Sequence, residues 1–258
     1  MEHKEHRTTA RVIDILELVA DSAEGMTFSE ISARLSMPKG SLHPILQTLC
    51  DRGYLRLSAG SRRYRAGAAL FAAGTRYVEN ADILTRIQRE LHKLSRTTYG
   101  TSYLGILTGG EALYLLKETA PAPFEMRSRP GYRIPAYCSA LGKALLSQHT
   151  DDELRALYAE PLEPLTPKSV PTLQQLSRQL AEVRRTGFAE EREEAALHVR
   201  CVGVPVYLDG CITAAISCSF PILEGYSENE AVLRTALLRT KEAVEAILAA
   251  DRDHWVCR

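Results

Sequence analysis

The sequence contains no run of 18 or more consecutive apolar residues, and residues 1–7 are charged and without an apolar stretch. A membrane-spanning helix needs about 20 apolar residues, and a secretory signal needs an apolar segment near the N-terminus. We therefore expect no membrane partner, no export, and a cytoplasmic location. The 258 residues, 45% hydrophobic and 25% charged, are enough for one large globular domain or two ordinary ones.

The six cysteines form no Cys-x-x-Cys pair, and the seven histidines are scattered along the chain. Zinc sites and thioredoxin-like sites need ligands or thiols at short, fixed spacing, so we expect no metal, no cofactor and reduced cysteines. A Cys–His hydrolase could use only His198 beside Cys201. Three residues apart on a strand, those side chains point to opposite faces. We therefore predict no catalytic residues and no enzyme activity.

The chain also carries no formal net charge at pH 7. The charge is nevertheless unevenly distributed. Residues 38–65 contain six lysines and arginines against one aspartate, a local charge of +5. A basic segment on a neutral chain is typical of a dedicated DNA-binding module, although a solvated surface is an alternative that charge alone leaves open.

Residues 1–66 have the pattern of a winged helix-turn-helix domain. Apolar residues at helical spacing predict a first helix over 9–20, and a capping box from Thr27 to Glu30 predicts the start of a second. The third helix has an apolar stripe at i, i+3, i+4 and i+7, formed by Leu42, Ile45, Leu46 and Leu49. Two short strands, 54–57 and 62–65, flank a glycine-containing turn and predict a hairpin.

The polar side chains outside this stripe, together with the arginines of the hairpin, are the predicted DNA contacts. Glutamine can pair with adenine through two hydrogen bonds, lysine can donate to guanine, and arginines suit phosphates or a minor groove. The predicted set is Lys39, Ser41, His43, Gln47, Thr48, Arg62, Arg63 and Arg65. A three-helix domain that binds protein is the alternative.

Pro44 interrupts the pattern of the third helix. Proline lacks the N–H group that a helix interior requires. The sequence therefore predicts either a helix that starts near Ser41, which would place Pro44 in the first turn, or a bend at His43–Pro44.

The rest of the chain predicts a linker helix and an α+β domain. Residues 67–79 are rich in alanine and glycine and form the linker, and residues 80–258 form the second domain. The predicted strands are 102–108, 112–118, 202–208 and 211–219, the last two joined by a hairpin turn at Asp209-Gly210. The predicted helices are 81–98, 139–148, 151–158, 173–187 and 228–250.

Motifs in both domains resemble the IclR family of transcription regulators. They include MPKGSLH at 37–43, RGY at 52–54, GYRIP at 131–135, SALGKAL at 139–145, RCVGVPV at 200–206 and SCSFP at 217–221. Their order and spacing extend over nearly the whole chain. The resemblance implies a winged helix-turn-helix, a linker helix, and a GAF-like effector-binding and oligomerisation domain. It also implies a homodimer or homotetramer on double-stranded operator DNA.

By position, the resemblance implies the residues that bind a small-molecule effector. They are Met126, Ile134, Ala140, Leu141, Glu191, Val199, Cys201, Ser217 and Ser219. Apolar walls with a few hydroxyl groups suit a small organic acid, and the helix beginning after Ser139 could hold a carboxylate. Each of these residues could instead belong to an ordinary core, Cys201 in particular, or the domain could serve only for oligomerisation.

The chain departs from the family pattern in four places. Pro44 replaces a usual arginine, Glu191 a usual aspartate, and His198 and Phe220 replace usual glycines. The interpretation that follows is a DNA-binding transcription regulator, activator or repressor, whose operator affinity changes when a small organic acid binds. The linker would transmit this change to the DNA-binding domains.

Overall fold

The computed structural model describes residues 6–79, 82–121, 126, 128–222, 229–252 and 255. The chain folds into two compact units, Met1–Asn80 and Ala81–Arg258. Because α4 (Ala68–Glu79), the helix predicted as a linker, begins against the hairpin, its contacts group it with the first unit. Each unit has a hydrophobic core of its own.

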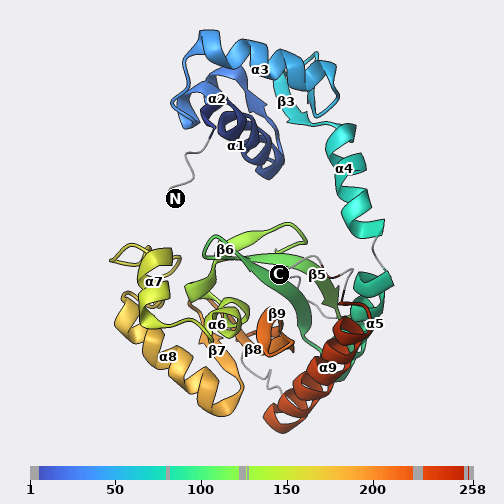
Figure 1. The fold of residues 1–258 in the computed structure, drawn as a ribbon, viewed down its shortest axis with the longest axis vertical. Helices are drawn as coiled ribbons and strands as arrows, with labels where there is room; N and C mark the ends of the chain where they lie inside the picture. The colour runs from blue at the N-terminus through green and yellow to red at the C-terminus, as the bar shows by residue number, and fades with distance from the viewer. Residues whose placement is uncertain are drawn as a thin grey trace. The chain divides into compact units, whose positions relative to one another are not determined.

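The N-terminal unit is a winged helix-turn-helix (Figure 1). Its elements are α1 (Arg7–Asp21), β1 (Met26–Thr27), α2 (Phe28–Arg34), α3 (Lys39–Asp51), β2 (Leu55–Leu57) and β3 (Arg63–Ala66). The predicted capping box is confirmed: Thr27 N–H donates to Glu30 Oε2 at 2.7 Å, and Glu30 N–H donates to Thr27 Oγ1 at 3.3 Å. The hairpin is confirmed too, with the two-residue strand β1 added along β3.

The start of α3 differs from the prediction. The helix begins at Lys39 with Pro38 as its N-cap, so the expected start near Ser41 is wrong, and Pro44 lies inside the helix. Proline has a helical φ, and only one hydrogen bond, to the carbonyl of Gly40, is lost. Both residues are exposed, so water can satisfy that carbonyl. A bend at His43–Pro44 stays a prediction.

The C-terminal unit is built on one antiparallel sheet of strand order β6-β5-β4-β9-β8-β7. Its strands are β4 (Thr101–Thr108), β5 (Glu111–Thr119), β6 (Arg133–Pro135), β7 (Ala189–Arg192), β8 (Val199–Leu208) and β9 (Cys211–Pro221). All four predicted strands are present. The two edge strands β6 and β7 were not predicted, because they are short and charged and lack apolar alternation.

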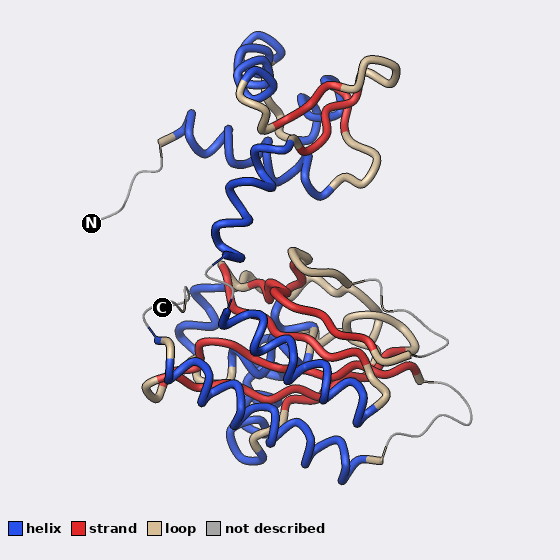
Figure 2. Tube along the Cα trace, turned by 90° about the vertical axis from the view of Figure 1, so that its right-hand side faces the viewer, coloured by secondary structure: helices blue, strands red, loops and turns tan. Residues whose placement is uncertain are grey.

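Helices cover both faces of this sheet. Figures 1 and 2 show α5 (Asp82–Thr98) and α9 (Glu230–Ala250) side by side on one face. The other face carries α6 (Ala140–Leu146), preceded by a short 3₁₀ turn (Ala136–Cys138), with α7 (Asp151–Leu157) and α8 (Leu173–Thr186) farther along the chain. Glu228, the predicted first residue of α9, lies outside the described residues. The side of the sheet that faces α6 is called the α6 face below.

Candidate functional site

Exposed polar residues on α3 form the candidate DNA-reading surface. The apolar stripe of Leu42, Leu46 and Leu49 is buried in the core of the unit. The five residues predicted on this helix are all exposed: Lys39, Ser41, His43, Gln47 and Thr48. Of these, Lys39, His43 and Gln47 are spaced by four residues, so they lie along one side of the helix.

Thr48 lies on a different side of α3. It is about 140° around the helix from His43, and its hydroxyl donates to the Pro44 carbonyl at 2.8 Å. With Pro44 and Arg52 it lines a groove against α1. Gln47 is also engaged, because its Nε2 donates to Asp51 Oδ1 at 2.8 Å. A base contact by Gln47 would have to replace that hydrogen bond.

Two of the three predicted wing arginines hold the hairpin to the rest of the unit. The Arg63 guanidinium donates to both oxygens of Glu30, at 3.0 and 3.3 Å, and to the Gly25 carbonyl at 2.7 Å. Arg65 donates to the Ala23 carbonyl at 3.2 Å. Arg62, in contrast, is exposed, and its side chain makes no hydrogen bond or ion pair with any other residue that the structure describes.

The second candidate site is on the α6 face of the large sheet. The strand register places one residue from each of five strands in a single cross-strand row: Glu191, Cys201, Ser219, Thr101 and Thr119. Directly paired residues point to the same side of a sheet. A second row two residues along contains Gly203, Ser217, Tyr103 and Lys117. The predicted effector residues Glu191, Cys201, Ser217 and Ser219 therefore share this face.

The other predicted effector residues lie on the same side. Ile134, Ala140 and Leu141 belong to the buried cluster under α6, and Met126 and Val199 pack against it. Ser139 is the N-cap of α6, as expected, and accepts a hydrogen bond from Gly142 N–H at 3.0 Å. The structure thus brings all nine residues together, and their contact with an effector stays a prediction.

Burial raises the pKa of both acidic groups in this site. Glu191 is 2% exposed, and burial raises the pKa of its carboxyl group. One oxygen, Oε2, accepts from the backbone N–H groups of Glu194 and Ala195 at 2.8 and 3.2 Å. Burial, followed by the nearby Glu191, raises the pKa of the Cys201 thiol well above its usual value. The thiol lies 2.9 Å from Ser219 Oγ and remains a neutral hydrogen-bonding group.

Two buried tyrosines join this site and were not predicted. The rings of Tyr103 and Tyr114 meet edge to face, with centroids 5.0 Å apart. The Tyr103 hydroxyl lies 2.7 Å from Ser128 Oγ. Burial raises the pKa of both phenols, so both remain hydrogen-bond donors. Only the register of β4 and β5 reveals them, because nothing in either strand alone distinguishes an aromatic core residue from a ligand contact.

A buried ion pair lies beside the site and also escaped the sequence analysis. Lys143 of α6 is fully buried, and its Nζ donates to Glu194 Oε1 at 2.5 Å. The backbone N–H of Glu194 is one of the two that hold Glu191. Thr166 and Ser169 donate to the Glu194 carbonyl, at 3.3 and 2.7 Å. The ion pair therefore fixes α6 to the turn that orients Glu191.

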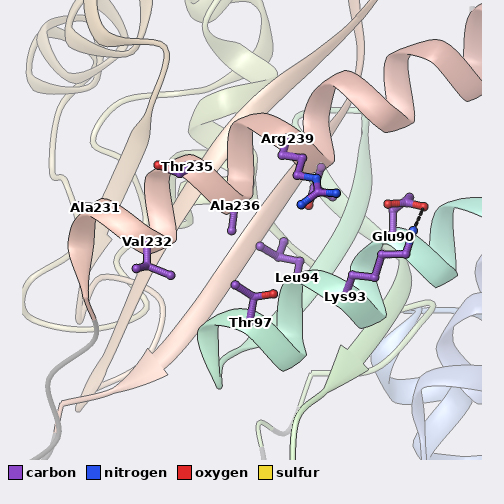
Figure 3. Close-up of a pocket in the computed structure, with 10 residues that line it drawn as sticks. Glu90, Lys93, Leu94, Thr97, Ala231, Val232, Thr235, Ala236 and Arg239 are labelled. Atoms are coloured by element: carbon purple, nitrogen blue, oxygen red, sulfur yellow. Dashed lines mark hydrogen bonds and ion pairs between the residues drawn. The ribbon is translucent and has the colours of Figure 1, made fainter.

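The opposite face of the sheet has a cavity of about 560 Å³ between α5 and α9 (Figure 3). Leu94, Val232 and Ala236 supply apolar walls, and Lys93 is paired with Glu90 at 2.7 Å. None of the predicted effector residues lines it. No buried, unbonded side-chain atom of a described residue faces it either. We therefore favour the α6 face as the effector site.

The first unit is a winged helix-turn-helix with an exposed polar helix, and the second is an α+β unit with a polar site inside its core. Together they define a DNA-binding transcription regulator. The chain matches two family descriptions, "IclR helix-turn-helix domain" over residues 8–58 and "Bacterial transcriptional regulator IclR C-terminal" over residues 75–246. It belongs to the IclR family of transcription regulators. The sequence-based identification of this family, and of a regulator and not an enzyme, is confirmed.

Several known proteins are similar over most of their length. The chain is 32% identical to the HTH-type transcriptional regulator KdgR of Escherichia coli, over 89% of this chain and 88% of that protein. It is 33% identical to XynR of the same organism, over 83% and 85%. The solved structure of an IclR homologue from Microbacterium hydrocarbonoxydans, complexed with 4-hydroxybenzoate, superposes with a TM-score of 0.80 at 21% identity, covering 95% of this chain and all of that one. Among the described residues, no helix has the length and hydropathy to span a membrane.

Proposed function

We propose that α3 reads operator DNA in the major groove through Lys39, His43 and Gln47. Ser41 and Thr48 would then face the sugar–phosphate backbone of the DNA, and Arg62 of the wing would contact a phosphate. The observation that carries this proposal is the exposed polar side of α3 opposite its buried apolar stripe. Winged helix-turn-helix proteins place this helix in the groove and the wing beside it. Arg63 and Arg65 act in this proposal by holding the wing in position.

We expect Arg62→Ala and Arg63→Ala to have different effects. Removing Arg62 should weaken operator binding and lower the slope of log affinity against log salt by about 1 for each DNA-bound protomer, because each loses one phosphate contact. Removing Arg63 should lower the melting temperature of the N-terminal unit, since Glu30 and the Gly25 carbonyl lose their partner. Titrations of an operator duplex at several salt concentrations, together with thermal unfolding, separate the two. A salt slope unchanged by Arg62→Ala would contradict the wing contact.

We expect Gln47→Ala to reduce sequence discrimination by about 1–3 kcal/mol, the usual contribution of a bidentate base contact. The measurement compares binding of an operator and of a scrambled duplex. Asp51→Asn is the matched variant: it removes the charge that holds Gln47 in the free protein, and should leave the discrimination intact. Equal loss on both duplexes in Gln47→Ala would show that Gln47 does not read a base.

We propose that a small organic acid binds on the α6 face and changes operator affinity. Support comes from the polar groups buried in the core there and from the 4-hydroxybenzoate in the homologue from Microbacterium hydrocarbonoxydans. Met126 packs over this cluster, and its flexible side chain can move to admit a ligand. An effector that binds only the folded protein raises its stability by RT ln(1 + [L]/Kd).

The test is a melting screen of small acids on the full chain, followed by operator titration with each acid that raises the melting temperature. At least one such acid should change operator affinity. If every stabilising acid left operator affinity unchanged, binding and regulation would not be coupled. We further propose a cytoplasmic homodimer or homotetramer, since a symmetric oligomer reads a near-palindromic operator with two copies of α3. Sedimentation of the free protein and of the operator complex tests the assembly.

A further inference from the structure

Two buried side-chain oxygens in the cross-strand row of the α6 face have no hydrogen-bond partner among the described residues. They are Glu191 Oε1 and Thr101 Oγ1, and their residues are 2% and 0% exposed. Leaving a buried polar group unpaired costs free energy, so each such group in a folded protein needs an explanation. A ligand that bonds to both would supply one.

The two atoms belong to the same cross-strand row. Glu191 is on β7 and Thr101 on β4, with Cys201 and Ser219 between them. The Cys201 thiol and the Ser219 hydroxyl lie 2.9 Å apart, and the thiol also interacts with the Glu191 carboxyl, as a weak donor that leaves room for a stronger one. The unpaired groups therefore stand at the two ends of a polar strip that spans three strand spacings, about 14 Å along the backbone, and the cluster around the strip is apolar.

The two ends differ in what they can bind. Backbone N–H groups hold Oε2 of Glu191, so in its ionised form the carboxylate presents Oε1 as a pure acceptor. A ligand carboxylate placed there would face a like charge. Thr101 lies beside Tyr103, whose cross-strand partner is Lys117, so donors gather at this end. Tyr103, Ser128 and Lys117 all carry donor groups there, the last also bonded to the Met126 carbonyl at 2.5 Å.

We propose that Thr101 is an effector-binding residue, and that the effector is a hydroxylated carboxylic acid whose hydroxyl group donates to Glu191 Oε1. Its carboxylate then lies toward Thr101, Tyr103 and Lys117. This inference rests on the proposed effector site and specifies which end of the site binds the hydroxyl group of the ligand and which end binds its carboxylate. It differs from the expectation, drawn from the sequence, of a carboxylate held at the start of α6. That helix has seven residues, and its N-cap hydroxyl accepts from Gly142, which removes one of its first N–H groups from ligand binding.

The test uses two pairs of acids that differ by one hydroxyl group far from the carboxylate: butyrate and 4-hydroxybutyrate, benzoate and 4-hydroxybenzoate. Calorimetry and melting shifts of the full chain give the affinities. We expect at least one hydroxylated member to bind at least about tenfold more tightly than its partner, since a site built to bond a hydroxyl rejects the analogue without it. Equal affinities in every pair that binds would overturn the inference and leave the proposed effector class intact. Binding by no acid would show that the proposed effector class itself is wrong.

Glu191→Gln tests the acceptor end. The amide oxygen should take the place of Oε2 against the two N–H groups, which leaves the NH₂ donor where Oε1 was. The advantage of the hydroxylated acid should then be lost, while the plain acid binds at least as well as before. A variant that keeps the full advantage would overturn the assignment of Glu191.

Thr101→Val tests the other end with a side chain of the same shape. The affinity of the hydroxylated acid should fall about fivefold or more, because a bonded hydroxyl is lost. The melting temperature without ligand should stay equal or rise, because an unpaired buried hydroxyl is removed. Thr119→Val, in the same row but exposed, is the control and should leave affinity unchanged. If both valine variants bind equally well, Thr101 does not contact the effector.

Discussion

Lys143→Met is expected to destabilise the C-terminal unit by about 3–5 kcal/mol, because it leaves the carboxylate of Glu194 buried without its partner. Lys143 is fully buried, so water cannot replace the ammonium group. Trp255, the only tryptophan of the chain, is 6% exposed in this unit. Its fluorescence during urea unfolding therefore reports on the C-terminal unit in the full-length protein.

The double variant Lys143→Met with Glu194→Leu is the control for this prediction. Replacing both partners of a buried pair by apolar groups removes the unpaired charge and is often close to neutral. We expect it to recover most of the stability that Lys143→Met loses. Its effector response should still be impaired, because Glu191 is positioned by the turn that the pair anchors. A double variant as unstable as the single one would contradict the ion-pair argument and indicate a packing defect.

Gly67→Ala is expected to lower the stability of the N-terminal unit by about 3 kcal/mol, at the upper end of the usual cost of overpacking. A methyl group on Gly67 would lie 2.1 Å from the Gly53 carbonyl oxygen, and backbone atoms cannot move aside easily. The same Gly53 carbonyl accepts the Ala69 N–H at 3.0 Å, where α4 begins. The substitution therefore separates the turn between α3 and β2 from the first turn of α4.

The matched control is Gly60→Ala at the tip of the wing. An added methyl group meets nothing within 4 Å there, and the backbone is not left-handed. It should leave stability unchanged or raise it by about 0.4–1 kcal/mol. Thermal unfolding followed by circular dichroism, with operator binding measured below the transition, checks both variants. Equal melting temperatures for Gly67→Ala and the unsubstituted protein would show that the chain relieves this contact cheaply.

Features set by neighbours along the chain were predictable from the sequence. The capping box of Thr27 and Glu30 and the N-cap at Ser139 each involve partners three residues apart. The mostly apolar runs of the long strands and the turn at Asp209-Gly210 are equally local. The family motifs indicated nine effector residues, and the structure places all nine on the α6 face of the large sheet. The start of α3 differs from the prediction because Pro44 is exposed, and an exposed position tolerates a proline inside the helix.

Only the tertiary structure decided which polar side chains have hydrogen-bond or ion-pair partners within the protein. The winged unit was evident from the sequence, but the three wing arginines cannot be told apart there. In the structure Arg63 binds Glu30, 33 positions away, and Arg65 binds the Ala23 carbonyl, whereas Arg62 is exposed. Lys143 and Glu194 are 51 positions apart, and Thr101 reaches the row of Glu191 only through the register of four strands. Periodicity tells which side chains face inward. Which inward polar groups find partners depends on strand pairing between distant segments, and that pairing leaves Glu191 Oε1 and Thr101 Oγ1 without partners among the described residues.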